Sequence, residues 1–468
     1  MVIVFVLVAV LVLAVVVTAN WYVWRRLFRD TTRGPGPVRR AGAVLIAGGW
    51  ILAVAALVAE RSGAPFRLQQ VLAWPGYLWL ALSIYLLLAV VAGEVVRPLL
   101  HRFLEHRARR TNQAPQGPGS GAPAPQANGS GVTAVSATAA QAGGAGGTTA
   151  ASATAPDAAS QPGPGDSTAP AAASRPDRGH DSEGSPQTPA TPIGPSRRLF
   201  VSRVVAGAAA AAAVGTVGYG TYGVLRGPKV ERVTVPLAKL PRAAHGYRIA
   251  VVSDVHLGPV LGRGFAQKVV DTINATQPDL IAVVGDLVDG SVKDLGPAAA
   301  PLAQLRARHG SYFVTGNHEY FSGAEQWVEE VRRLGLDPLE NARKEMPYFD
   351  LAGVNDVAGE EEGQGPDFAK ALGDRDTARA CVLLAHQPVQ IHDAVEHGVD
   401  LQLSGHTHGG QLWPGNLIAS GANPTLAGLE RYGDTQLYVS RGAGAWGPPT
   451  RVGAPSDITL IELASKQA

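Results

Sequence analysis

The first 20 residues of this 468-residue chain, MVIVFVLVAVLVLAVVVTAN, carry no charged side chain. A helix of about 20 apolar residues crosses the hydrocarbon core of a bilayer, which is about 30 Å thick. The run therefore predicts a membrane span. A secretory signal peptide is the alternative, but it begins with basic residues and has a shorter apolar core. Here Arg25 and Arg26 follow the run instead.

Two further apolar runs, at about 41–59 and 71–93, are also long enough to span a bilayer. Trp24, Trp74 and Tyr77 lie near run ends, where amphipathic rings favour the lipid–water interface. Only 17% of the chain is charged, which is low for a soluble protein. We therefore expect an all-α membrane region at 1–110 with three transmembrane helices. Buried helices of a large soluble core are the alternative.

Residues 111–195 consist almost wholly of Ala, Gly, Pro, Ser, Thr and Gln. Such a composition lacks the apolar side chains that a packed core needs, so the segment is predicted to be a disordered linker.

Residues 196–229 begin with Ser-Arg-Arg-Leu-Phe-Val and continue into an apolar stretch that ends at Leu225. Paired arginines before a mildly apolar helix resemble a twin-arginine export signal, although its internal position is unusual. The alternative is an ordinary fourth transmembrane helix. Whether the Ala-rich stretch 207–213 is cleaved stays open.

The distribution of arginine predicts the membrane topology, because Lys and Arg near span ends stay in the cytoplasm. Arginines are frequent after the first and third spans, whereas the loop between the second and third holds only Arg61 and Arg67. Four spans then place the linker in the cytoplasm and everything after about residue 226 outside. We expect a multi-pass cell-membrane protein with an extracytoplasmic C-terminal domain.

Net charge and cysteine content exclude some functions. The formal net charge is +2, which gives no support for a strongly basic nucleic-acid binder. The single cysteine, Cys381, cannot form an internal disulfide or a Cys-rich zinc or iron–sulfur site.

From about residue 230, short Val/Ile/Leu runs alternate with amphipathic segments, which is typical of an α/β domain. The expected strands are 247–253, 279–284, 311–315, 380–385, 399–403, 436–440 and 457–462. The expected helices lie near 264–276, 297–308, 323–334 and 388–397.

Polar residues follow five of these strands, and sites assemble at the carboxyl ends of strands in α/β sheets. Seven of them are candidate metal ligands: Asp254, His256, Asp286, Asn317, His386, His406 and His408. Carboxylates, imidazoles and an amide, with no thiolate, suit Mn, Fe, Co or Zn. Any one of the histidines alone could be a hydrogen-bonded core residue, but five groups in succession are hard to explain in that way.

Seven ligands are too many for one tetrahedral ion and fit two ions that share a carboxylate. Such a pair lowers the pKa of a bound water and clamps the oxygens of an in-line displacement at phosphorus. We therefore expect a phosphoester hydrolase with two divalent metal ions, manganese first, with iron, zinc or cobalt as alternatives.

The order DVH, GDLVD, GNHE, LLAHQP, SGHTHGG resembles the calcineurin-like metallophosphoesterase superfamily through most of 230–468. The flanking segments are similar to its bacterial branch of membrane-bound or twin-arginine-exported members. The resemblance implies a four-layer α/β/β/α sandwich. It also implies that Asp254, His256 and His408 hold one metal, that Asn317, His386 and His406 hold the other, and that Asp286 bridges them.

The resemblance further implies that a metal-bound hydroxide attacks phosphorus. His318 would face the substrate and protonate the leaving oxygen or stabilise phosphoryl charge. Asp289 would orient His318. The chain departs from the branch at Ser456-Asp457, where Pro-Glu is usual, which puts only details in doubt.

The sequence disfavours three other functions. GDLVDG lacks the arginine that follows the second Asp of protein Ser/Thr phosphatases, which disfavours a phosphoprotein phosphatase. A non-catalytic membrane receptor or scaffold would be expected to have lost a ligand, and none is missing. No basic patch with interleaved aromatics indicates a nuclease, so no nucleic-acid partner is expected.

Two loops are predicted to form the substrate site above the metals, at about 257–265 and 409–428. The second carries Leu412, Trp413, Leu417 and Ile418, which suggests a lipid-linked phosphoester or contact with the membrane. The alternative is that these side chains pack beneath the loop. The sequence does not give the oligomeric state, the physiological substrate or the preference for mono- or diesters.

Overall fold

The computed structural model describes residues 2–112 and 197–467, so the predicted disordered linker lies almost wholly outside the described residues. Four long helices are present in the described part: α1 (Val2–Trp24), α2 (Pro37–Arg61), α3 (Phe66–Asn112) and α4 (Arg197–Leu225). Arg25–Arg29 extend α1 as a π-helical turn. All four helices are long and apolar enough to cross a membrane.

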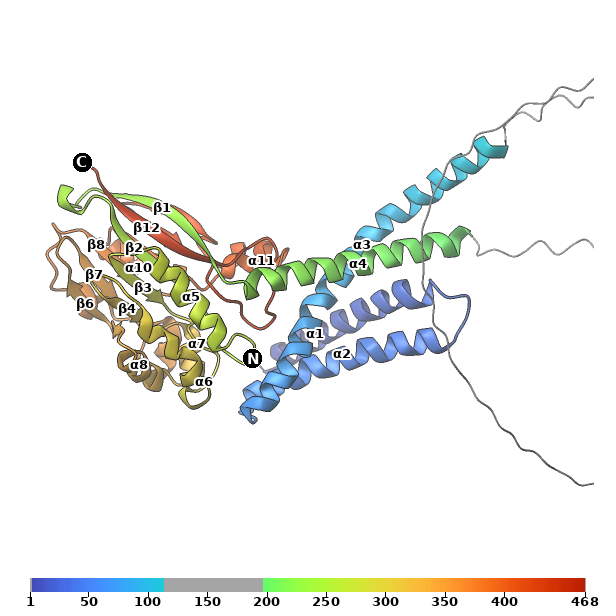
Figure 1. The fold of residues 1–468 in the computed structure, drawn as a ribbon, viewed down its shortest axis with the longest axis horizontal. Coiled ribbons are helices and arrows are strands. Elements are labelled where there is room, and N and C mark those ends of the chain that lie inside the picture. The colour runs from blue at the N-terminus through green and yellow to red at the C-terminus, as the bar shows by residue number, and fades with distance from the viewer. Residues whose placement is uncertain (1, 113–196, 468) are drawn as a thin grey trace, which may run out of the picture. The chain divides into compact units, whose positions relative to one another are not determined.

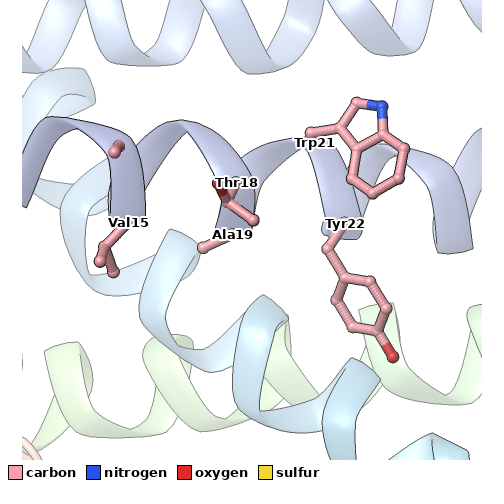
Figure 2. Close-up of a pocket in the computed structure, with 6 residues that line it drawn as sticks. Val15, Thr18, Ala19, Trp21 and Tyr22 are labelled. Atoms are coloured by element: carbon pink, nitrogen blue, oxygen red, sulfur yellow. The ribbon is translucent and has the colours of Figure 1, made fainter. Parts of the chain in front are cut away.

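Large apolar side chains on these helices face outward. Leu7 and Leu11 of α1 are 63% and 64% exposed, and similar side chains line the outer faces of α2 and α3. A soluble protein rarely exposes so large an apolar surface. Trp21 and Tyr22 project from α1 near its C-terminal end, one on each side of the helix (Figure 2). The arrangement supports the expected membrane region.

The helices also pack on one another. Trp50 of α2 donates from Nε1 to Oδ1 of Asn20 on α1 at 2.8 Å. One buried cluster joins α1, α3 and α4, with members Val23, Ala81, Tyr85, Leu86, Ala213 and Val217. These contacts hold the four helices together as a bundle.

The C-terminal part contains two six-stranded sheets (Figure 1). The first runs in the order β1 (Lys229–Leu237), β12 (Asp457–Ser465), β2 (Tyr247–Val252), β3 (Leu280–Val284), β4 (Ser311–Val314), β5 (Asp337–Pro338). The second runs in the order β10 (Gly428–Tyr432), β11 (Thr435–Val439), β9 (Leu401–Ser404), β8 (Cys381–Leu384), β7 (Asp350–Gly353), β6 (Ala342–Glu345).

Side chains that point alternately to the two faces of a strand build a hydrophobic core on each face of each sheet. On β2, Ile249 and Val251 belong to the core between the sheets, whereas Ala250 and Val252 belong to the core on the outer face. Side chains alternate between faces in a strand, so a continuous apolar run fills both cores.

Helices cover both outer faces. Those of the first sheet are α5 (Arg263–Ala275), α6 (Val292–Ala299) and α8 (Ala324–Arg333), and those of the second are α9 (Phe368–Leu372) and α10 (Ile391–Glu396). The predicted α/β/β/α sandwich is therefore confirmed.

One predicted helix is wrong. The sequence placed a helix near 297–308, but α6 begins at Val292 and is followed by a 3-10 turn at Ala300–Gln304. Ser291 caps α6, because its hydroxyl accepts from the amide of Asp294. A cap at that position starts the helix one turn earlier than expected and places Pro297 inside it. Strand β1, which pairs in parallel with β12, was not predicted.

Candidate metal centre

The seven candidate ligands lie just after the carboxyl ends of five strands. Asp254 and His256 follow β2, Asp286 follows β3, and Asn317 follows β4. His386 follows β8 of the second sheet, and His406 and His408 follow β9. Neighbouring parallel strands end at the same edge of their sheet, so the two sheets bring all five loops together.

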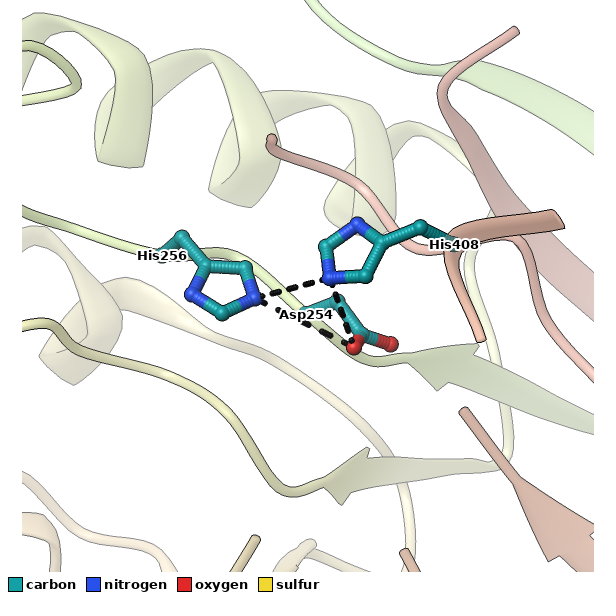
Figure 3. Close-up of side chains that lie close together, drawn as sticks. All are labelled: Asp254, His256 and His408. Atoms are coloured by element: carbon teal, nitrogen blue, oxygen red, sulfur yellow. Dashed lines mark hydrogen bonds and ion pairs between the residues drawn. The ribbon is translucent and has the colours of Figure 1, made fainter. Parts of the chain in front are cut away.

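Three of the ligands form one group: Asp254, His256 and His408 (Figure 3). Nε2 of His408 lies 3.0 Å from Nε2 of His256 and 3.3 Å from Oδ1 of Asp254. The backbone amide of His406 donates to both oxygens of Asp254 at 3.1 Å and fixes this carboxylate. All three side chains are buried.

A second group consists of Asp286, His386 and His406. Nε2 of His386 lies 3.1 Å from Oδ2 of Asp286. Nδ1 of His406 lies 2.9 Å from Oδ1 of Asn317, which places the amide oxygen of Asn317 beside this group.

Asp286 lies between the two groups. Its Oδ1 accepts from the amide of His318 at 2.9 Å. Its Oδ2 faces His386 of the second group and lies 3.8 Å from Nε2 of His256 in the first. One carboxylate thus contacts both groups, each of which combines ligands from the two sheets.

The backbone at the ligands is strained. Five of the seven have a positive φ: Asp254 (51°), His256 (47°), Asp286 (52°), His406 (71°) and His408 (52°). Residues other than glycine rarely adopt this conformation, and where it occurs it clusters at functional sites. The surrounding sheets hold the ligand loops in conformations that the loops alone would not prefer.

Two glycines allow the loops to approach closely. A Cβ on Gly285, whose φ is +74°, would lie 2.6 Å from Nδ1 of His386. A Cβ on Gly316 would lie 2.5 Å from the amide nitrogen of Asp286. Any side chain at either position would push a ligand out of place.

Asp289 connects the first group to His318. Its Oδ1 lies 2.8 Å from Nδ1 of His256 and 2.7 Å from Nδ1 of His318. Burial alone would lower the pKa of His318, but the hydrogen bond and charge of Asp289 outweigh it and raise that pKa to about 9. Burial would raise the pKa of Asp289, but the two imidazoles lower it to about 2.

The donor set fits divalent metal ions. Burial lowers the pKa of His386, but the charge of Asp286 outweighs burial and raises that pKa. Nδ1 of His386 donates to the carbonyl oxygen of Val284 at 2.9 Å, so Nε2 is the ring nitrogen that would bind an ion. Among the described residues this buried Nε2 has no hydrogen-bond partner. Burial lowers the pKa of His406 to about 4, and it lowers that of His408 as well. Neutral imidazoles beside carboxylates are the ligands that such ions take.

Glu319 was not predicted as a site residue, yet this fully buried carboxylate organises the site. It accepts from the amides of Asp286 (2.9 Å), Leu287 (2.7 Å) and Gly316 (2.6 Å) and so joins the loops after β3 and β4. Burial raises its pKa to about 7. The signal available in the sequence was its place in the Gly-Asn-His-Glu run.

Arg451 was also missed. It is buried, and Nη2 lies 3.0 Å from Nδ1 of His408 while Nη1 donates to the carbonyl oxygen of the same residue at 3.1 Å. Nε donates to the carbonyl of Gly444 at 2.6 Å. Burial lowers the pKa of Arg451 to about 10. This guanidinium ties the His408 turn to the loop before β12.

Comparison with known proteins decides the family. A family model described as calcineurin-like phosphoesterase matches residues 247–410. An uncharacterized metallophosphoesterase of Helicobacter pylori is 37% identical over 275 residues, which is 58% of this chain and 74% of that protein. The chain belongs to the calcineurin-like phosphoesterase family. An uncharacterized metallophosphoesterase of Aquifex aeolicus is 35% identical over 51% of this chain and 92% of that protein.

A calcineurin-like phosphoesterase with membrane helices matches as well. The transmembrane protein with metallophosphoesterase domain of Danio rerio is 39% identical over 264 residues, 53% of this chain. The match spans 60% of that protein, which is less than two thirds of its length. Relatives from bacteria and animals match alike, so the narrower bacterial branch stays a prediction. The superfamily and the enzyme class, a phosphoester hydrolase, are confirmed.

Proposed function

We propose that this calcineurin-like phosphoesterase is a membrane-anchored hydrolase that uses two divalent metal ions to cleave a phosphodiester, pyrophosphate or phosphomonoester. The observation that carries the proposal is the pair of ligand groups that meet at Asp286. A lone structural metal would need only one of the groups.

In this proposal Asp254, His256 and His408 hold one ion, and Asn317, His386 and His406 hold the other. Asp286 bridges them, which its contacts with both groups support. Manganese is the first candidate, with iron, zinc or cobalt as alternatives. A metal pair of this kind supplies an activated water and neutralises charge on the phosphoryl oxygens.

His318 is the proposed general acid. Asp289 holds its Nδ1, which leaves Nε2 free to donate a proton to the leaving oxygen. The raised pKa of His318, about 9, keeps the ring protonated at neutral pH. Asp289 acts through His318 and His256 and is therefore a positioning residue. Because the complete ligand set is present, a non-catalytic receptor or scaffold is disfavoured.

We also propose that the protein is a multi-pass membrane protein with segments 1–110, 111–195, 196–229 and 230–468, whose last segment is extracytoplasmic. Polar contacts at one end of the bundle support the placement of that end in the cytoplasm. Arg26 forms an ion pair with Glu94 at 2.7 Å, and Arg203 donates a hydrogen bond to the carbonyl oxygen of Thr31 at 3.0 Å. The twin-arginine-like pair, Arg197 and Arg198, opens α4 at the same end as Arg203.

A lipid-linked substrate is the finer proposal. Helix α11 (Gly415–Ala422) has no buried residue, and Ile418 on it is 80% exposed. Phe321 and Trp446, which are 76% and 53% exposed, place their rings 5.6 and 5.7 Å from the His318 ring. An acyl or isoprenoid chain would cover this apolar surface. Leu412 instead packs against the buried cluster of α1, α3 and α4.

The test uses the full-length protein in detergent or vesicles, stripped of metal and then supplied with Mn, Fe, Zn or Mg. We expect hydrolysis to return with metal at about two ions per chain. We expect a lipid-linked pyrophosphate to be cleaved faster than a soluble chromogenic diester. Equal rates on both substrates would overturn the lipid proposal, and no hydrolysis of any ester with two ions bound would overturn the proposed function.

Replacing Asp289 with asparagine is expected to move the loss of kcat at high pH to lower pH. Burial lowers the pKa of His318, but Asp289 and neighbouring carboxylates raise it to about 9, so the acid form persists until the pH rises through about 9. Without the Asp289 carboxylate the largest raising contributions are lost, whereas burial still lowers this pKa, so the acid form is lost at a lower pH. The measurement is kcat between pH 6 and 10 with metal content determined at each end. An unchanged high-pH limb would contradict the role of Asp289.

A further inference from the structure

The far end of α2 and the start of α3 contact a loop of the metal centre. Ala56 of α2 and Ala73 and Tyr77 of α3 form a small buried cluster, and Val260 packs against it. Val260 lies four residues after the ligand His256, in a loop predicted to shape the substrate site. The helix bundle therefore reaches the rim of the site.

Glu60 lies in the last turn of α2, within this contact. The hydroxyl of Tyr77, which is 4% exposed, donates to Oε2 of Glu60. Glu60 is within electrostatic range of Asp289, His318 and His256. A carboxylate borne by a membrane helix thus lies close enough to the proposed general acid and its partner to interact with their charges.

Glu60 differs from other acidic residues of the bundle. Asp30 and Glu94 both pair with Arg26, at 3.0 and 2.7 Å. Among the described residues, no cationic nitrogen lies within 4 Å of the Glu60 carboxylate. Its charge is therefore not cancelled by an ion pair and acts on whatever binds at the metal centre.

The effect of this carboxylate depends on the charge of the substrate. A phosphomonoester is a dianion above its second pKa of about 6, whereas a phosphodiester carries one negative charge. Like charges near a protein surface repel with an energy that scales with the product of the charges. A fixed carboxylate at the rim therefore weakens the binding of the monoester more than that of the diester. Repulsion of a competing ligand in this way makes a site specific.

We propose that Glu60 determines substrate specificity from the membrane helix by rejecting dianionic phosphomonoesters in favour of monoanionic phosphodiesters. The inference rests on the proposed function and narrows it to diesterase chemistry. Tyr77 holds the carboxylate toward the site, and its removal should weaken the selection less than removal of the charge itself.

The experiment compares full-length wild type, Glu60→Gln, Tyr77→Phe and the control Glu105→Gln at pH 8.5. Glu105 is an exposed carboxylate at the other end of α3. One readout is the ratio of kcat/KM for a chromogenic diester to that for its monoester. The second is the dissociation constant of inorganic phosphate for the metal-loaded protein, measured by calorimetry, which needs no turnover. Metal content is measured for every variant.

We expect Glu60→Gln to lower the diester-to-monoester ratio about tenfold and to bind phosphate more tightly, with Glu105→Gln unchanged. Tyr77→Phe should lie between them. An unchanged ratio and unchanged phosphate affinity in Glu60→Gln, with full metal content, would overturn the inference. If no variant hydrolyses any ester but Glu60→Gln binds phosphate more tightly, the proposed function fails and the charge selection by Glu60 stands.

Discussion

Asp286→Asn is expected to lower kcat/KM about 1,000-fold or more and to reduce bound metal below two ions per chain. Asp286 contacts the imidazoles of both ligand groups, because its Oδ2 lies near His386 and His256. An amide keeps the size of the side chain but removes the charge that would bridge two cations. Metal ions contribute several kcal/mol of transition-state stabilisation, and each 1.36 kcal/mol is a factor of ten in rate.

The measurement pairs hydrolysis rates with metal analysis of the purified variant. Asp434→Asn is a matched control, because Asp434 is exposed in the turn between β10 and β11. Thermal unfolding with and without added metal separates loss of ions from loss of fold. Retention of two tightly bound ions in Asp286→Asn would contradict the bridging role.

His318→Asn is expected to lower kcat about 100- to 10,000-fold while both ions stay bound. General acids contribute rate factors of this size. The imidazole of His318 contacts Asp289 through Nδ1 and lies outside the proposed ligand set, so its removal should spare the metals. The loss should be greatest for substrates with a poor leaving group and smallest for a nitrophenolate, which needs little protonation.

His245→Asn serves as the control, because His245 is exposed and precedes β2, at the opposite end of this strand from Asp254. Metal content and kcat are determined for both variants on an alkyl ester and an aryl ester. An equal loss on both esters would show that His318 does not protonate the leaving oxygen. Loss of one ion in His318→Asn would instead move this residue into the ligand set.

The sequence predicted that the seven candidate ligands meet at one site, because they follow strands in short, recognisable runs. Asp254, Asp286 and His386 each come within two residues of a strand end, and parallel strands must bring such positions together. The contact of Asp289 with His318 was expected, whereas its simultaneous contact with His256 was not. The second contact depends on the approach of two loops that no local pattern encodes.

Other features required the three-dimensional structure. Glu319 acts on backbone amides, which every residue carries, so the sequence does not reveal its partners. Arg451 reaches His408 across 43 residues. The expected helix at 297–308 failed because Ser291 caps α6 before its prolines. Glu60 lies 194 residues before Asp254, the nearest proposed ligand along the chain, and its relation to the site depends on packing of the helix bundle.

The short connection between α4 and β1 limits where this hydrolase can work. Only residues 226–228 separate Leu225 from Lys229, and three extended residues reach about 10 Å. Lys268 of α5 also donates to the carbonyl of Leu225, which fastens the domain to the end of the helix. In the proposed membrane-anchored protein, the domain would therefore diffuse only in the plane of the bilayer. For a substrate that is itself a lipid, both reactants are confined to two dimensions, and the encounter rate follows the mole fraction of substrate in the membrane rather than its bulk concentration.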